Sequence, residues 1–120
     1  MTYLILIYGA ESAWAGMPQS NLKEMYDAYM TYTDELAGSG SLRGGHELQP
    51  THTATTVRVR DGKVLKTDGP FAETKEQLGG FYIIDVPNLD AALEWASKCP
   101  GAKNGCTEVR PIVDHSKPRA

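Results

Sequence analysis

The chain has 120 residues, a formal net charge of −3 and 22% charged residues. This length suits one hydrophobic core, so we expect a single domain over residues 1–120, and the ordinary apolar content excludes a disordered chain. Mild acidity without a run of Lys or Arg disfavours nucleic acid as a partner. The longest apolar run, residues 3–8, is too short to cross a membrane and lacks the flanks of a signal peptide.

The first elements predicted along the chain are a strand and a helix. Residues 2–8 are apolar at nearly every position, which is typical of a strand buried on both faces. A loop from Gly9 to Pro18 follows, and Ser20 is expected to cap a helix that ends near Gly38. The apolar stripe of this helix consists of Leu22, Met25, Tyr26, Tyr29, Thr33 and Leu36.

The middle of the chain predicts an edge strand and a β-hairpin. Residues 41–48 contain two adjacent glycines and are expected to form an irregular or edge strand. Residues 55–60 and 63–67 flank Asp61-Gly62, a pair that favours a type I′ turn. The register places Val59 opposite Val64 and Val57 opposite Lys66. The other face carries Arg58, Arg60, Lys63 and Leu65, so we expect the hairpin to lie half solvated at a sheet edge.

The last third predicts a loop, a strand, a helix and a final strand. Residues 68–80 are expected to form a loop, and residues 81–86 a second buried strand. Asn88 is expected to cap a helix that Pro100-Gly101 ends, with an apolar stripe of Leu89, Ala92, Leu93, Ala96 and Cys99. Residues 107–113 read as an edge strand because they contain Pro111, and 114–120 as a frayed tail.

The order of these elements predicts an α+β fold: ferredoxin-like βαββαβ with an inserted β-hairpin. Two helices cover only one face of its sheet, yet both central strands are apolar on both faces. A bare apolar sheet face is larger than the patch that a monomer usually exposes. We therefore expect a homodimer packed sheet against sheet; the hairpin folding back over its own sheet is the alternative.

The cysteines and the missing motifs limit the chemistry. Cys99 and Cys106 are interpreted as free thiols of a reducing cytoplasm, with a disulfide between them as the alternative. The sequence has no glycine-rich phosphate loop, dinucleotide fingerprint or metal-ligand cluster, so neither a cofactor nor a metal is expected.

The segment 68–82 reads Asp-Gly-Pro-Phe-Ala-Glu-Thr-Lys-Glu-Gln-Leu-Gly-Gly-Phe-Tyr. Together with the strand 3–9, Leu-Gln-Pro at 48–50 and Glu-Val-Arg-Pro at 108–111, it resembles the DGPF subgroup of the YCII-related proteins. The resemblance implies a dimeric α+β barrel, a bacterial source and a cytoplasmic location. It also implies a genetic link to extracytoplasmic-function sigma factors. Broader YCII relatives include a dehydrochlorinase, and a His–Asp pair has been proposed as their active site.

Only the acidic member of that His–Asp pair has a counterpart in this chain. The relatives have a His near the start of the first helix, where this chain has Gln19, Ser20 and Asn21. The counterpart of the acid is Asp68. It either holds a turn through its carboxylate or acts as a general acid or base, its pKa raised by burial beside Phe71, which would also contact the ligand.

Other candidate site residues also have two readings each. His46 is either catalytic or structural, and as a strand neighbour of Glu47 it should point to the opposite face. Tyr8 and Tyr82 either fill the core or line a ligand pocket. Glu73 belongs either to a ligand site or to a solvated turn, and Arg110 either binds a substrate carboxylate or pairs with a Glu.

Two functions follow from these residues. One is a cofactor-independent enzyme that moves a proton on a small organic molecule, with Asp68 and a His or Tyr as its acid and base. The other is a non-catalytic module that binds a metabolite or a regulatory protein linked to a sigma factor, with Arg58 and Arg60 of the hairpin as the contact.

Overall fold

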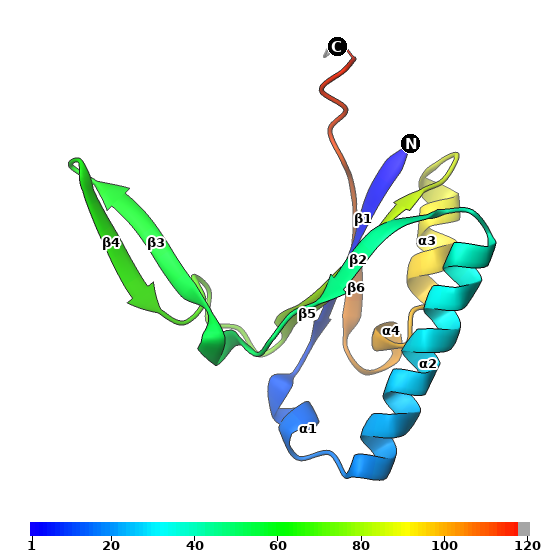
Figure 1. Cartoon of the computed structure of the whole chain (residues 1–120), viewed down its shortest axis with the longest axis horizontal. Helices are drawn as coiled ribbons and strands as arrows, with labels where there is room; N and C mark the ends of the chain where they lie inside the picture. The colour runs from blue at the N-terminus through cyan, green and yellow to red at the C-terminus, as the bar shows by residue number, and fades with distance from the viewer. Residues whose placement is uncertain (118–120) are drawn as a thin grey trace.

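The computed structural model describes residues 1–117. Its main sheet is antiparallel with the strand order β2-β5-β1-β6. The strands are β1 (Thr2–Gly9), β2 (Leu42–Glu47), β5 (Gln77–Asp85) and β6 (Cys106–Pro111). Helices α2 (Gln19–Gly38) and α3 (Leu89–Lys98) cover one face of this sheet (Figure 1). The ferredoxin-like order is confirmed, with β1 and β5 in the centre and β6 at an edge.

The core lies between the central strands and the two helices. Tyr3 and Ile5 of β1, with Ile84 of β5, are buried against α2 and α3. Because side chains alternate along a strand, Leu4 and Leu6 face the other side, where they lie opposite Ile83 and Phe81. The face of the sheet that carries these four residues is here called the open face, and no helix of residues 1–117 lies over it (Figure 1).

The hairpin has the predicted register but not the predicted place. Strands β3 (Thr55–Arg60) and β4 (Lys63–Asp68) pair Val59 with Val64, and positive φ angles of 51° at Asp61 and 76° at Gly62 fit the type I′ turn. However, β3 and β4 form a separate two-stranded sheet. The edge placement was therefore wrong, because the hairpin leaves the body at Ala54 and Gly69 and projects from it (Figure 1).

Several predicted boundaries are corrected. Pro18, not Ser20, precedes α2, and the predicted 9–18 loop contains the short helix α1 (Glu11–Ala15). The predicted 68–80 loop loses residue 68 to β4 and residues 77–80 to β5. The last strand ends at Pro111 rather than at 113.

The α3 cap and the cysteines agree with the sequence predictions, whereas part of the α3 stripe and two short helices do not. The Asn88 side chain caps α3 as predicted by accepting a bond from the Ala91 amide, but Leu89 and Leu93 of its predicted stripe are exposed. Two further short helices, η1 (Thr51–Thr53) and α4 (Gly101–Asn104), were not predicted. Cys99 and Cys106 are free, as expected. Of the predicted tail, 114–117 form a turn, and 118–120 lie outside the described residues.

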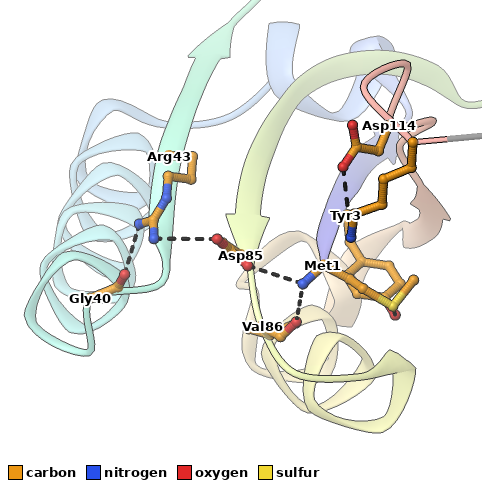
Figure 2. A network of polar contacts seen from close by, with 8 residues as sticks. Met1, Tyr3, Gly40, Arg43, Asp85, Val86 and Asp114 are labelled. Carbon is orange, nitrogen blue, oxygen red and sulfur yellow. Dashed lines mark hydrogen bonds and ion pairs between the residues drawn. The ribbon is translucent and has the colours of Figure 1, made fainter.

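A polar network closes the end of the sheet where β1 begins. The amino group of Met1 donates to Asp85 Oδ1 at 3.2 Å and to the Val86 carbonyl at 3.0 Å (Figure 2). Arg43 of β2 pairs with the other carboxylate oxygen of Asp85 at 3.4 Å and donates to the Gly40 carbonyl. These groups are largely solvent-exposed, so the network ties strands together without adding much stability.

Within residues 1–117, we find no helix with the length and apolar character needed to cross a membrane.

Candidate functional site

The long helix α2 leaves a pocket between itself and the sheet. Its buried residues, Tyr32 and Leu36, both lie in its C-terminal half. Residues of α2 from Leu22 to Asp34 line a pocket of about 1200 Å³, together with α1 and the ends of β1, β2 and β5. The pocket lies at the opposite end of the sheet from the Met1 network.

Several aromatic residues line the pocket. Trp14 of α1 and Tyr26 of α2 meet edge to face, with 6.2 Å between ring centroids. Tyr29 of α2 and Tyr82 of β5 also line the pocket, on the side of the sheet that the helices cover. Aromatic and apolar surface with a few polar groups is the usual composition of a site for a small organic molecule.

One solvent-exposed carboxylate of the lining contacts an aromatic residue of the pocket. Glu47, at the end of β2, accepts a hydrogen bond from the Tyr26 hydroxyl at 3.1 Å. Burial, with a smaller contribution from Glu47, raises the pKa of Tyr26, so this phenol stays protonated at neutral pH. A carboxylate offers about four acceptor positions, so Glu47 keeps the capacity to accept a proton or a bond from a ligand.

A second polar group lies deeper in the pocket. The hydroxyls of Thr33 and Tyr82 are 2.7 Å apart, and Thr33 also donates to the Tyr29 carbonyl at 2.7 Å. Burial raises the pKa of Tyr82, although its bond to Thr33 acts in the opposite direction. Tyr82 therefore remains a neutral phenol at physiological pH, able to donate or accept a hydrogen bond.

Glu11 fixes the rim of the pocket. Its two carboxylate oxygens accept bonds from the amide and the hydroxyl of Thr51, both at 2.7 Å. Its own amide donates to the Gln77 side chain at 2.9 Å. These contacts tie α1 to η1 and β5, which explains how a helix as short as α1 holds its position.

We expect the buried tyrosines to make stability fall in alkali. Burial is the largest cause that raises the pKa of Tyr29, Tyr32 and Tyr82 above the ordinary 10.0. Because the folded state favours the protonated phenol, this stabilisation is complete below pH 10 and is lost as the pH rises further. The midpoint of thermal unfolding should therefore decline above pH 10, and the Tyr82→Phe variant should decline less steeply.

An absorbance titration at 295 nm checks the same groups. These three of the six tyrosines should ionise only as the fold is lost. Ionisation of all six near pH 10, with native circular dichroism, would contradict the burial argument.

The structure brings some of the predicted site residues together and leaves others outside the pocket. Tyr8, His46 and Tyr82 line it. His46 meets Phe81 edge to face at 5.9 Å, while Glu47 reaches α2, so the two neighbours point to opposite faces as expected. The pocket lining does not include Asp68, Phe71, Glu73 or Arg110.

Each of these four residues lies in an exposed position. Asp68 pairs with Thr55 at the base of the hairpin. The Phe71 ring lies 5.1 Å from the Arg58 guanidinium carbon, and Glu73 is in the exposed stretch before β5. Arg110 forms an ion pair with Glu108, which is one of the two readings for it. The catalytic and ligand-binding roles of these residues stay predictions.

Sequence reasoning did not single out Trp14, Tyr26, Tyr29 and Glu47 as site residues. Tyr26 and Tyr29 were assigned to a core stripe, and spacing alone does not distinguish a core stripe from a pocket wall. Trp14 offered one signal, because a large aromatic residue in a presumed loop needs a surface to pack against.

Within the described part of the chain, no group of three His, Cys, Asp or Glu side chains is arranged to hold a metal ion.

Fold and pocket together define a ferredoxin-like α+β protein whose pocket is lined in part by aromatic side chains. The model of the YCII-related domain matches residues 1–116. The chain therefore belongs to the YCII-related family, as its resemblance implied, while the DGPF subgroup stays a prediction. An uncharacterised protein of Rhizobium meliloti is 37% identical over 115 residues, which cover 94% of this chain and 93% of that protein.

A solved structure also has this fold. It is the 5-chloro-2-hydroxyhydroquinone dehydrochlorinase of Burkholderia phenoliruptrix, in complex with 2,5-dihydroxybenzoquinone. The TM-score is 0.56 at 17% identity, and the alignment covers 97% of each chain. At this identity the likeness shows a common fold.

Proposed function

We propose that this chain binds a small, neutral hydroxylated aromatic molecule and moves a proton on it without a cofactor. The observation that carries the proposal is the placement of the Glu47 carboxylate at the solvent-exposed side of a pocket with aromatic lining, in contact with the Tyr26 phenol. Glu47 would act as the base, and Tyr82 would orient a ligand oxygen through its hydroxyl. This replaces Asp68 with Glu47 as the first candidate for the base.

The charges of the pocket support a neutral ligand. Among residues 1–117, the lining contains three carboxylates, Glu11, Asp34 and Glu47, and two histidines, but neither Lys nor Arg. An anionic ligand would find no permanent positive charge there, whereas a neutral ring could pack against the aromatic lining and donate hydroxyl bonds to carboxylates. The dehydrochlorinase of the same fold supports this ligand class.

Binding can be followed at the two tryptophans. Trp14 lines the pocket, whereas Trp95 belongs to α3 and packs against Tyr32 in the core. Titration with hydroquinone should shift the indole N–H resonance of Trp14 and leave that of Trp95 in place. Benzoate, of similar size but anionic, should bind at least about 10-fold more weakly. If both indole signals move together, or neither moves, the pocket is not the binding site.

The base is tested with 5-chloro-2-hydroxyhydroquinone as the probe and chloride release as the readout. Glu47→Gln keeps the size and the bond to Tyr26, so binding should persist while turnover falls about 100-fold, a typical general-base effect. Glu94→Gln, an exposed change on α3, is the matched control. Asp68→Asn tests the sequence prediction, since unchanged turnover removes that residue from the mechanism. Equal turnover of wild type and Glu47→Gln would contradict the proposal.

The non-catalytic reading has one observation in its favour. The acid that the resemblance points to, Asp68, is exposed at the hairpin base rather than in the pocket. Binding of hydroquinone at Trp14 without any turnover would identify the chain as a metabolite-binding module. Its proposed sigma-factor partner stays a prediction.

We also infer that two copies associate through the open face. Leu4, Leu6, Phe81 and Ile83 form two apolar cross-strand pairs there, and no helix in the described part of the chain covers this face. A second copy of the sheet is the cover predicted from the sequence. We expect sedimentation to give a mass near twice the 13.1 kDa of one chain.

A further inference from the structure

The β3–β4 hairpin, residues 55–68, is here called the arm, and almost all of its residues are exposed to solvent. Every residue of β4 is exposed, and so is every residue of β3 except Thr56. Val57, Val59 and Val64 keep 57–60% of their surface accessible on one face of the arm. An isolated two-stranded hairpin is at best marginally stable in water, so this valine face needs a packing partner.

The dimensions of the chain show that the arm does not fold back on its own body. The Cα radius of gyration is 16.6 Å, whereas about 14 Å is expected for a compact domain of this length. The arm projects on the side of the sheet away from α2 and α3 (Figure 1). The alternative cover expected from the sequence, the hairpin over its own sheet, is therefore not what the structure contains.

Charge favours a second copy as the partner of the arm. Residues 55–68 contain four cationic and two acidic side chains, a net charge of +2, so the rest of the chain carries −5. The opposite net charges of the arm and of the rest of the chain favour the approach of an arm to another copy, a long-range attraction that does not depend on which face of the arm makes contact. In a two-fold dimer this attraction operates twice, since each arm meets the body of the other chain.

The area of contact between two copies also favours a second copy as the partner of the arm. Four strands about 4.8 Å apart and about 20 Å long present roughly 380 Å² per open face, so two faces bury about 760 Å². Stable dimers usually bury about 1,200–2,000 Å². Two arms of about 190 Å², each covering an equal area of the partner, bring the total to roughly 1,500 Å². The arms therefore about double the area over which the two copies can meet.

We propose that the β3–β4 hairpin is an exchanged arm whose valine face, Val57, Val59 and Val64, packs against a second copy seated on the open face. In the dimer, the arm of each chain packs against the other chain. The proposal extends the association inferred for the open face. It does not depend on the chemistry of the pocket, because ligand binding is measured separately by the Trp14 indole resonance.

The test replaces the apolar pair of the arm without weakening the arm. In Val59→Lys/Val64→Glu, two directly opposite residues become an oppositely charged pair, which is favourable across strands. Leu65→Glu is the matched control, because it lies on the other face and gains a cross-strand pair with Arg58. By sedimentation equilibrium, the double variant should raise the dimer dissociation constant about 100-fold, and the control should change it less than about 3-fold.

Hydrogen exchange of the wild-type chain gives an independent result. Amides of 55–68 should be protected where the dimer is populated and should exchange quickly after dilution to monomer. A wild-type dimer that persists unchanged in the double variant, with arm amides exchanging at one rate throughout, overturns the arm but leaves the open-face association. A monomer at all concentrations, including one whose arm is covered only by a different protein, overturns both.

Discussion

Replacing Gly105 with alanine is expected to cost about 4 kcal/mol of folding free energy, among the largest effects for one methyl group. A Cβ at this position would overlap the carbonyl oxygen of Tyr8 and lie 3.0 Å from the Gly9 Cα. Both are backbone atoms of the central strand β1, so neither can move aside as a side chain could. The change therefore forces β6 away from β1 at the wall of the pocket.

Gly38→Ala provides the control. No atom lies within 4 Å of a Cβ built at Gly38, which ends α2 in helical conformation. Alanine should stabilise the chain here by about 0.5–1 kcal/mol through its better helix propensity and reduced unfolded-state entropy. Urea unfolding of the two variants measures both effects. Similar stability of Gly105→Ala and wild type would show that the β1–β6 contact relaxes more easily than its geometry indicates.

The regular elements were predictable because their signals are local. The doubly apolar runs identify β1 and most of β5 as central strands, since only a strand covered on both faces needs such a run. Asp61-Gly62 fixes the turn and therefore the register, so Val59 lies opposite Val64 as expected. The position of the arm was not predictable, because alternating residues say which face is apolar and not what covers it.

The missed elements depend on contacts distant in sequence. Helix α1 has five residues and no side-chain cap, so its own sequence gives it little stability. It is held by the bonds of Glu11 to Thr51 and Gln77, which lie 40 and 66 residues away. The expected 9–18 loop was the natural reading without them.

The candidate site was only partly predictable for the same reason. Tyr8, His46 and Tyr82 were noted because they lie in or near recognisable strands. Glu47 was considered only as a neighbour of His46, and its importance depends on the Tyr26 hydroxyl 21 residues earlier. The family resemblance drew attention to Asp68 through its conspicuous Gly-Pro turn, and that turn lies at the base of the arm.

Tyr32 connects the core to the pocket, and two substitutions separate its contributions. Its hydroxyl donates to the Trp95 carbonyl at 2.6 Å, and its ring meets Tyr82 and Trp95 edge to face at 5.4 and 6.1 Å. Tyr32→Phe removes only the hydrogen bond and should cost about 1–2 kcal/mol. Tyr32→Ala also removes the ring from a site that is 4% exposed and should cost about 4 kcal/mol. Leu93→Ala, half exposed on α3, should cost less than about 1 kcal/mol.

The same variants should differ in ligand binding, which a purely structural role of Tyr32 would not predict. Tyr82 places its hydroxyl beside Thr33 while its ring rests on Tyr32. Phenylalanine preserves that support, so the hydroquinone titration of Trp14 should be unchanged in Tyr32→Phe. Alanine leaves the Tyr82 ring free to turn, and binding should weaken about 10-fold, which is about 1.4 kcal/mol. If Tyr32→Ala binds like wild type, the Tyr82 hydroxyl does not contact the ligand, and Glu47 with Tyr26 must orient it alone.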